Sequence, residues 1–198
     1  MKPIVNAALI GFAFLISTAS MAQLANFTGP EIGANLAISQ GQIKFKNSSI
    51  QDTSQGVALH AGYGLEANDD TLFMFGLDYN LGNVAIGSGS QEFSENSVKI
   101  YYKNPYGLSA GLGRLINDTT LAFAKLSYEA TSFAGDGQFQ EVKLRGYGLS
   151  AGARYIFQKN TYLQGELKHI RYTKAVNATM TDEKPYTLQL NVGLGYQF

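Results

Sequence analysis

The sequence has no cysteine. This absence excludes disulfide bonds, thiolate metal sites and a lipid-modified cysteine as a membrane anchor. Tryptophan is also absent, and the only histidines are His60 and His169. They are too far apart for a closely spaced zinc pair, and neither lies in a His-x-Ser pattern or beside a matched acidic pair that would make a nucleophile or general base. We therefore expect no metal, no cofactor and no enzymatic activity.

Neither sign of charge is in excess, because the 198 residues include 15 Lys and Arg and 15 Asp and Glu. A nucleic-acid-binding protein usually carries a basic excess, so nucleic acid is not an expected partner. Beyond the N-terminal region, no segment is apolar enough for a membrane helix. If the protein lies in a membrane it has to be a closed β-barrel, since only helices and barrels satisfy every backbone polar group in lipid.

The N-terminal region has the layout of a secretory signal peptide. Lys2 is followed by an almost purely apolar run over residues 4–16, and Ser20-Met21-Ala22 provides the small residues of a cleavage site. A transmembrane anchor is the alternative, but it would need about 18 or more apolar residues. We predict cleavage after Ala22, which gives a signal peptide over residues 1–22 and one domain over residues 23–198.

The last twelve residues, TLQLNVGLGYQF, alternate strictly between large apolar and polar or small residues. This period of two predicts a β-strand with one apolar face. A half-buried strand of a soluble sandwich is the alternative. The segment is longer than the roughly five or six residues of a usual soluble strand, whereas a tilted membrane strand needs about 9–11.

The same alternation recurs along the chain and predicts eight strands in all. Within residues 97–115 one parity is kept throughout, with Tyr102 on the apolar face and Lys103 on the other. The connections alternate between long polar stretches and short turns, which is typical of outer-membrane barrels and has no reason to occur in a soluble sandwich. The eight segments lie within residues 31–40, 56–67, 72–82, 97–115, 120–133, 146–157, 161–173 and 187–198.

We therefore predict an all-β fold, a transmembrane eight-stranded antiparallel up-and-down β-barrel. Both termini would be periplasmic, with the four long stretches extracellular and the three short turns periplasmic. The final strand would pair with the first one near residues 32–38, because an open edge in lipid leaves backbone groups unsatisfied.

Three segments resemble the small eight-stranded outer-membrane barrels of the OmpA, OmpX and Ail type: YGLSAGLGRLIND (106–118), YGLSAGARYIF (147–157) and NVGLGYQF (191–198). The resemblance implies the outer membrane of a Gram-negative bacterium, contact with its lipid and lipopolysaccharide, and a monomer. It also implies that Tyr196 and Phe198 belong to a C-terminal signal read by the barrel-assembly machinery. Members of this family include structural proteins, adhesins and proteins with no known role.

An eight-stranded barrel has an interior just wide enough for side chains to fill, so we expect a plugged lumen. Because buried charges have to be paired, the charged residues on the inward face should form a salt-bridge and hydrogen-bond network. A lipid A-modifying enzyme and a narrow ion pathway are the alternatives. The predicted network consists of Glu66, Asp78, Lys99, Lys125, Glu129, Arg154, Glu166 and Lys168.

The long stretches are the other candidates for function, because loops on a rigid scaffold often carry it. They contain isolated apolar residues, which would either pack between loops or form a surface for adhesion to host proteins. We expect a role in surface interaction, adhesion or envelope structure, with host surface proteins as candidate partners. The main apolar candidates are Ile43, Phe45, Phe93 and Phe139.

Overall fold

The computed structural model describes residues 24–45, 48–90, 97–135, 141–173 and 185–198. Only the backbone is described at residues 43–45, 48–50, 86–90 and 97–100. The expected signal peptide over residues 1–22 lies outside the described part of the chain.

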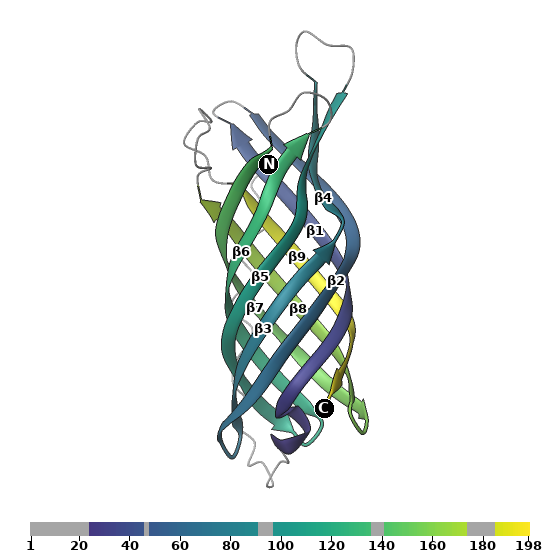
Figure 1. Ribbon diagram of the computed structural model, residues 1–198, viewed down its shortest axis with the longest axis vertical. Coiled ribbons are helices and arrows are strands. Elements are labelled where there is room, and N and C mark those ends of the chain that lie inside the picture. The colour runs from purple at the N-terminus through teal and green to yellow at the C-terminus, as the bar shows by residue number, and fades with distance from the viewer. Residues whose placement is uncertain (1–23, 46–47, 91–96, 136–140, 174–184) are drawn as a thin grey trace, which may run out of the picture.

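The described chain forms one antiparallel sheet that closes into a barrel (Figure 1). A single 3-10 turn, η1 (Leu24–Phe27), precedes the sheet at the end where the short turns lie. The strands are β1 (Gly29–Phe45), β2 (Ser48–Asn68), β3 (Thr71–Leu81), β4 (Asn83–Ser90), β5 (Ser97–Asn117), β6 (Thr120–Gly135), β7 (Val142–Gln158), β8 (Thr161–Thr173) and β9 (Tyr186–Gln197).

Two pairings close the ring. Strand β9 pairs with β1 over twelve positions, from Glu31 opposite Gln197 to Gln42 opposite Tyr186. Strand β3 pairs with β5, from Thr71 opposite Arg114 to Tyr79 opposite Tyr106. The first of these pairings confirms the prediction that the final strand meets the first one.

The number of strands differs from the prediction, because the sheet has nine rather than eight. Gly82 has a φ of +103° and interrupts the chain between β3 and β4. Both strands then pair with β5, β3 with its second half and β4 with its first half. The stretch after Gly82, which we expected to be a loop, thus continues the wall of the barrel.

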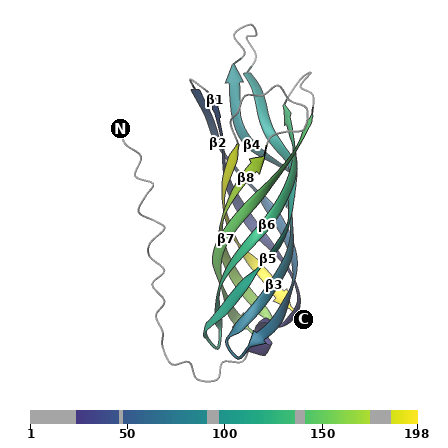
Figure 2. The same ribbon diagram turned by 90° about the vertical axis from the view of Figure 1, so that its left-hand side faces the viewer.

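The strands also extend further than the apolar alternation suggested. Strands β1 and β2 remain in register as far as Phe45 opposite Ser48, so most of the polar stretch expected as a loop is a paired hairpin. Figure 2 shows strand hairpins rising at the end opposite the short turns. Polar side chains are compatible with strands there, because both faces of a hairpin beyond the lipid can meet water.

A bulge in β5 overturns the prediction of one uniform parity. The register with β6 shifts between Lys103 and Tyr106, and Asn104 has a φ of +42°. As a result Tyr102 is fully buried in the interior, while Lys103 is exposed. An extra residue on one strand reverses the faces of all residues beyond it, which alternation alone does not reveal.

The outward face is apolar and exposed, as an exterior in contact with lipid requires. Tyr79, Tyr106, Tyr128 and Tyr147 form a row along β3, β5, β6 and β7 near the long-loop end; we call it the tyrosine row. Tyr79 lies opposite Tyr106, and Tyr128 lies opposite Tyr147. Among the described residues, no helix is long and apolar enough to cross a membrane.

Candidate functional site

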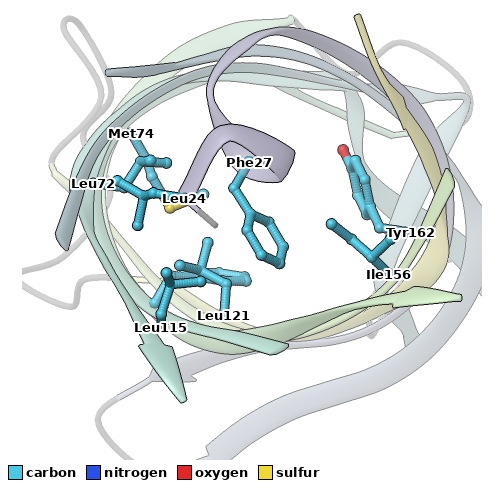
Figure 3. Close-up of a cluster of buried hydrophobic side chains, with 9 residues drawn as sticks. Leu24, Phe27, Leu72, Met74, Leu115, Leu121, Ile156 and Tyr162 are labelled. Carbon is cyan, nitrogen blue, oxygen red and sulfur yellow. The ribbon is translucent and has the colours of Figure 1, made fainter. Parts of the chain in front are cut away.

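At the short-turn end, the interior is filled by apolar side chains. Figure 3 shows Phe27 of η1 pointing into the barrel between Leu121 and Tyr162, with Leu24 directed towards Leu72. We call this group the turn-end cluster; it consists of Leu24, Phe27, Leu72, Met74, Leu115, Leu121, Phe123, Ile156 and Tyr162.

Gly64 and the side-chain amide of Gln197 hold η1 in this position. A Cβ at Gly64 would lie 2.3 Å from the carbonyl oxygen of Phe27, so only glycine allows the backbone of η1 to approach β2 this closely. The Gln197 amide donates hydrogen bonds to the carbonyl oxygens of Thr28 at 3.1 Å and Pro30 at 3.0 Å. The last strand thereby fastens the segment that enters the barrel.

The next layer of the interior centres on Arg154. Its guanidinium donates hydrogen bonds to both carboxylate oxygens of Glu31 and, at 2.6 Å, to Oε1 of Gln164. The same guanidinium lies 4.7 Å from the ring centroid of Tyr162. A buried arginine with a bidentate carboxylate and an aromatic face has its charge and its donors well satisfied.

Two lysines continue the network. Lys125 pairs with Glu166 at 3.1 Å. Lys168 pairs with Asp78 at 2.8 Å and with Glu129 at 3.2 Å, and the Ser127 hydroxyl donates to Glu129 at 2.6 Å. Lys125, Arg154 and Lys168 therefore each have a carboxylate partner.

His60 also lies in the interior, but its ring has no carboxylate partner. Its Nδ1 lies 3.2 Å from Nδ2 of Asn35, and its Nε2 lies 2.7 Å from the hydroxyl of Tyr162. Both ring nitrogens of His60 are thus engaged by uncharged side chains, and the ring connects Asn35 of β1 with Tyr162 of β8.

A second apolar group lies at the long-loop end, and we call it the loop-end cluster. Tyr102 and Tyr172 pack with their ring centroids 4.8 Å apart. The group comprises Val84, Tyr102, Phe133, Leu144, Ile170 and Tyr172. Polar side chains separate it from the charged layers: Gln189 donates to Asn191 at 2.7 Å and to Asn80 at 3.4 Å.

Six of the eight predicted network residues, Asp78, Lys125, Glu129, Arg154, Glu166 and Lys168, lie in the interior and interact as described. Glu66 does not join them. It has inward parity and lies opposite Leu72 near the short-turn end of β2, but it is exposed, whereas Leu72 is buried. Lys99 is in the backbone-only part of β5, and the bulge removes the parity on which its inward placement rested.

Glu31 was missed, although it is the partner of Arg154. Its position was visible in the sequence, since Glu31 has the same parity as Asn35 and Ser39 on β1, which are also buried. The signal was weak because it stands at the very start of the alternating segment.

The remaining predicted residues lie at the two ends of the barrel. Tyr196 and Phe198 are exposed on the outer face at the short-turn end, with ring centroids 5.0 Å apart in an edge-to-face arrangement. His169 is exposed on β8, 5.7 Å from the ring of Tyr186. Ile43 and Phe45 belong to β1 by their backbone, while Phe93 and Phe139 lie outside the described residues. Among the described side chains, no group of three or more His, Cys, Asp or Glu residues could hold a metal ion.

A barrel with an apolar exterior and a charged, internally paired interior is the arrangement of an outer-membrane protein. The family model described as "Outer membrane protein beta-barrel domain" matches residues 10–198. The chain belongs to this family. The family places it in the outer membrane of a Gram-negative bacterium. No curated protein matches the chain.

Several solved barrels are similar to this one in fold. Ail, the attachment invasion locus protein of Yersinia pestis, has a TM-score of 0.51 at 16% identity, over 85% of this chain and 100% of Ail. Neisserial surface protein A has a TM-score of 0.53 at 17% identity, over 86% of this chain and 98% of its own chain. OprG from Pseudomonas aeruginosa has a TM-score of 0.54 at 13% identity, over 86% of this chain and 96% of its own chain. These identities establish a shared architecture only.

Proposed function

We propose that this barrel acts through its extracellular end, in surface interaction or adhesion or as a structural element of the envelope, and that its lumen is closed to solutes. The observation that carries the proposal is the order in which the layers of side chains fill the interior. The paired charges lie between the turn-end cluster and the loop-end cluster, so a solute would have to displace buried groups in every layer. Because the interior of such a barrel is filled, its outer surface is the part available for binding.

The hairpins at the long-loop end support this reading. Paired backbone reaches Phe45 and Ser48 in one hairpin and Ser90 and Ser97 in another, so the ends of the strands present the loops on a rigid base. One of the similar barrels, Ail, was crystallised with the heparin analogue sucrose octasulfate. We propose host surface molecules as partners of this end, with the N- and C-termini on the periplasmic side.

The other expected features belong to the same proposal. Residues 1–22 would be removed as a signal peptide, and the mature barrel would be a monomer in contact with lipid and lipopolysaccharide. Tyr196 and Phe198 lie together on the outer face near the C-terminus, where a terminal assembly signal would be accessible to the barrel-assembly machinery.

A lipid A-modifying enzyme is less well supported. Both ring nitrogens of His60 are engaged, by Asn35 and Tyr162, and neither contact is to a carboxylate or a serine. His169 lies on the outward face beside Tyr186. A narrow ion pathway is also less well supported, because the cations of the interior are each paired.

The decisive experiment replaces the extracellular ends. Each hairpin would be shortened to a two-residue Asn-Gly turn, one hairpin at a time, in cells that display the protein. Binding to heparin, extracellular matrix proteins and complement regulators would be compared with the intact barrel. We expect at least one shortened hairpin to abolish binding, while heat-modifiable migration on gels shows that the barrel still folds.

Two further measurements decide between the alternatives. Planar-bilayer recording of the intact protein should show no large, stable conductance, and porin-like channels would disprove a closed lumen. Mass spectrometry of lipid A from cells with and without the gene should give identical spectra. A changed lipid A profile, with no binding to any surface molecule, would favour the enzyme instead.

A further inference from the structure

Near the long-loop end, four basic side chains are exposed on the outward side of β5, β7 and β8. They are Lys103, Lys143, Arg145 and Arg171. The described outward residues of β1 and β2 at this end are neutral: past Ile38 and Val57, these strands continue with Gln40, Gln51, Thr53 and Gln55. A further exposed arginine, Arg114 on β5, lies at the short-turn end and pairs with Asp70 at 2.9 Å. Among the described side chains, the positive charge near the long-loop end is therefore confined to one side of the barrel.

These cations lie immediately beside the tyrosine row. Arg171 is directly opposite Tyr147 in the register of β7 and β8, and Arg145 precedes Tyr147 by two residues on the same face of β7. Tyrosine side chains favour the level of lipid headgroups, with the ring in the apolar zone and the hydroxyl in the polar one. The basic side chains thus leave the barrel wall at the height where headgroups lie.

The two arginines are close neighbours without a carboxylate partner. Because Tyr147 is opposite Arg171 and Arg145 is opposite Thr173, Arg145 and Arg171 are diagonal neighbours on one face, with backbone positions roughly 7–8 Å apart. None of the described carboxylates pairs with either guanidinium. Lys103 differs in this respect, because its ammonium lies 3.5 Å from Glu141.

Two like charges placed side by side on a sheet repel each other. An anion that bridges them would remove this repulsion, and a phosphate monoester suits the need, because a guanidinium binds it through two parallel N–H···O bonds. Lys143, two residues from Arg145 on the same face of β7, can add a third positive charge. A soluble ligand is a poor candidate, since the side chains point sideways into the headgroup zone.

We propose that Lys143, Arg145 and Arg171 form a binding site for a phosphate group of lipid A, the phosphorylated glycolipid of the outer leaflet. The site lies on the β7–β8 side of the barrel, so lipopolysaccharide is held on one side only. The inference rests on the proposed placement of the long-loop end outside the cell, because lipid A occupies the outer leaflet.

The test uses the purified full-length barrel in detergent with bisphosphorylated lipid A as the probe. The double variant R145Q/R171Q is compared with K103Q, which removes a cation of the same region that already has a carboxylate partner. Binding is measured by fluorescence anisotropy of labelled lipid A, in EDTA so that bridging divalent cations are absent. We expect binding at least tenfold weaker for R145Q/R171Q and within twofold of the original for K103Q.

Three other probes identify the ligand chemistry. Dephosphorylated lipid A should bind the intact barrel as weakly as bisphosphorylated lipid A binds R145Q/R171Q, and neither phosphatidylglycerol nor inorganic phosphate at equal concentration should compete. Equal binding of the dephosphorylated lipid, effective competition by phosphatidylglycerol, or an unchanged affinity of R145Q/R171Q would each overturn the proposal. Heat-modifiable migration on gels shows whether each variant still folds. The hairpin-binding assay tests the proposed surface role separately from lipid A binding, so the two proposals can fail independently.

Discussion

The guanidinium of Arg154 on β7 donates hydrogen bonds to both carboxylate oxygens of Glu31 on β1. Strands β8 and β9 separate these two strands in the sheet, so the ion pair spans the interior of the barrel. Both side chains are buried. The pair therefore connects the first strand of the barrel to its third-last one, in addition to the hydrogen bonds of the wall.

Replacing Arg154 by Met should be strongly destabilising, because Glu31 is left buried without its partner. Breaking a buried ion pair in this way typically costs about 3–5 kcal/mol. The double variant E31Q/R154M should lose less than R154M alone, since its interior carries no unpaired charge. The measurement is urea unfolding in lipid vesicles, followed by heat-modifiable migration. Equal losses in the two variants would show that the ion pair contributes no coupling of this kind.

The fold was largely predictable because lipid imposes a simple rule on every strand. The outward residue has to be apolar where the strand crosses lipid, and β9 shows this without interruption from Leu188 to Tyr196. The rule fails where lipid no longer acts. Beyond the apolar band, β1 and β2 pair through polar residues, and nothing in their side chains marks them as strand.

The departures within the wall have a different cause. The bulge near Asn104 and the break at Gly82 depend on backbone conformations that the pattern of apolar residues does not encode. In the interior, parity identified which charged residues face inward, but not which of them pair. That choice depends on how far each strand is shifted against the next, which placed Glu31 beside Arg154 and left Glu66 outside the network.

Phe27 should contribute strongly to stability, because its ring is almost completely buried in the turn-end cluster. We expect Phe27→Ala to lower the free energy of unfolding by about 3–5 kcal/mol, the usual cost of emptying a phenylalanine site. Ala25→Ser is the matched control, since Ala25 is exposed in the same turn. Both variants would be unfolded by urea in lipid vesicles.

Gly64→Val tests the same contact from the other side. The new side chain would meet the carbonyl of Phe27, so η1 would have to leave its place without any change to its own residues. A loss comparable to that of Phe27→Ala is expected. If Phe27→Ala lowers the free energy of unfolding strongly and Gly64→Val does not, η1 does not pack against β2 as described.

The turn between β2 and β3 should make stability depend on pH through Asp70. A hydrogen bond from the Thr71 hydroxyl, and then the charge of Arg114, hold the pKa of the Asp70 carboxyl below its ordinary value. A lowered pKa means that the stabilisation is present at neutral pH and disappears as pH falls through that lowered value. Asp70→Asn should therefore be less stable than the original protein at pH 7 and equal to it at about pH 2. A difference that persists unchanged in acid would rule out the carboxylate as its source.

Phe198 is expected to matter for assembly in cells more than for stability. Its ring is 62% exposed and its main contact is Tyr196, while its backbone N–H donates to the Pro30 carbonyl at 2.9 Å. Phe198→Asp keeps that backbone bond and removes the aromatic ring. We expect less of the barrel to reach the membrane in cells, yet nearly unchanged thermal stability after refolding from urea into detergent. Poor refolding in detergent would show that Phe198 is an ordinary structural residue.

Gly82 and Gly165 form a natural pair for testing the break between β3 and β4. A Cβ at either position would meet no atom within 4 Å, so neither substitution to alanine creates a clash. They differ in the backbone, because Gly82 has a φ of +103° and Gly165 lies in the regular part of β8. Gly82→Ala should therefore cost about 1–2 kcal/mol from backbone strain alone, whereas Gly165→Ala should be neutral or stabilise by up to about 1 kcal/mol. The loss in G82A should be accompanied by faster proteolysis in the β4–β5 hairpin, since Val84 positions β4 against the loop-end cluster. If G82A and G165A behave alike, the positive φ is not required there, and β3 and β4 can run as one uninterrupted strand.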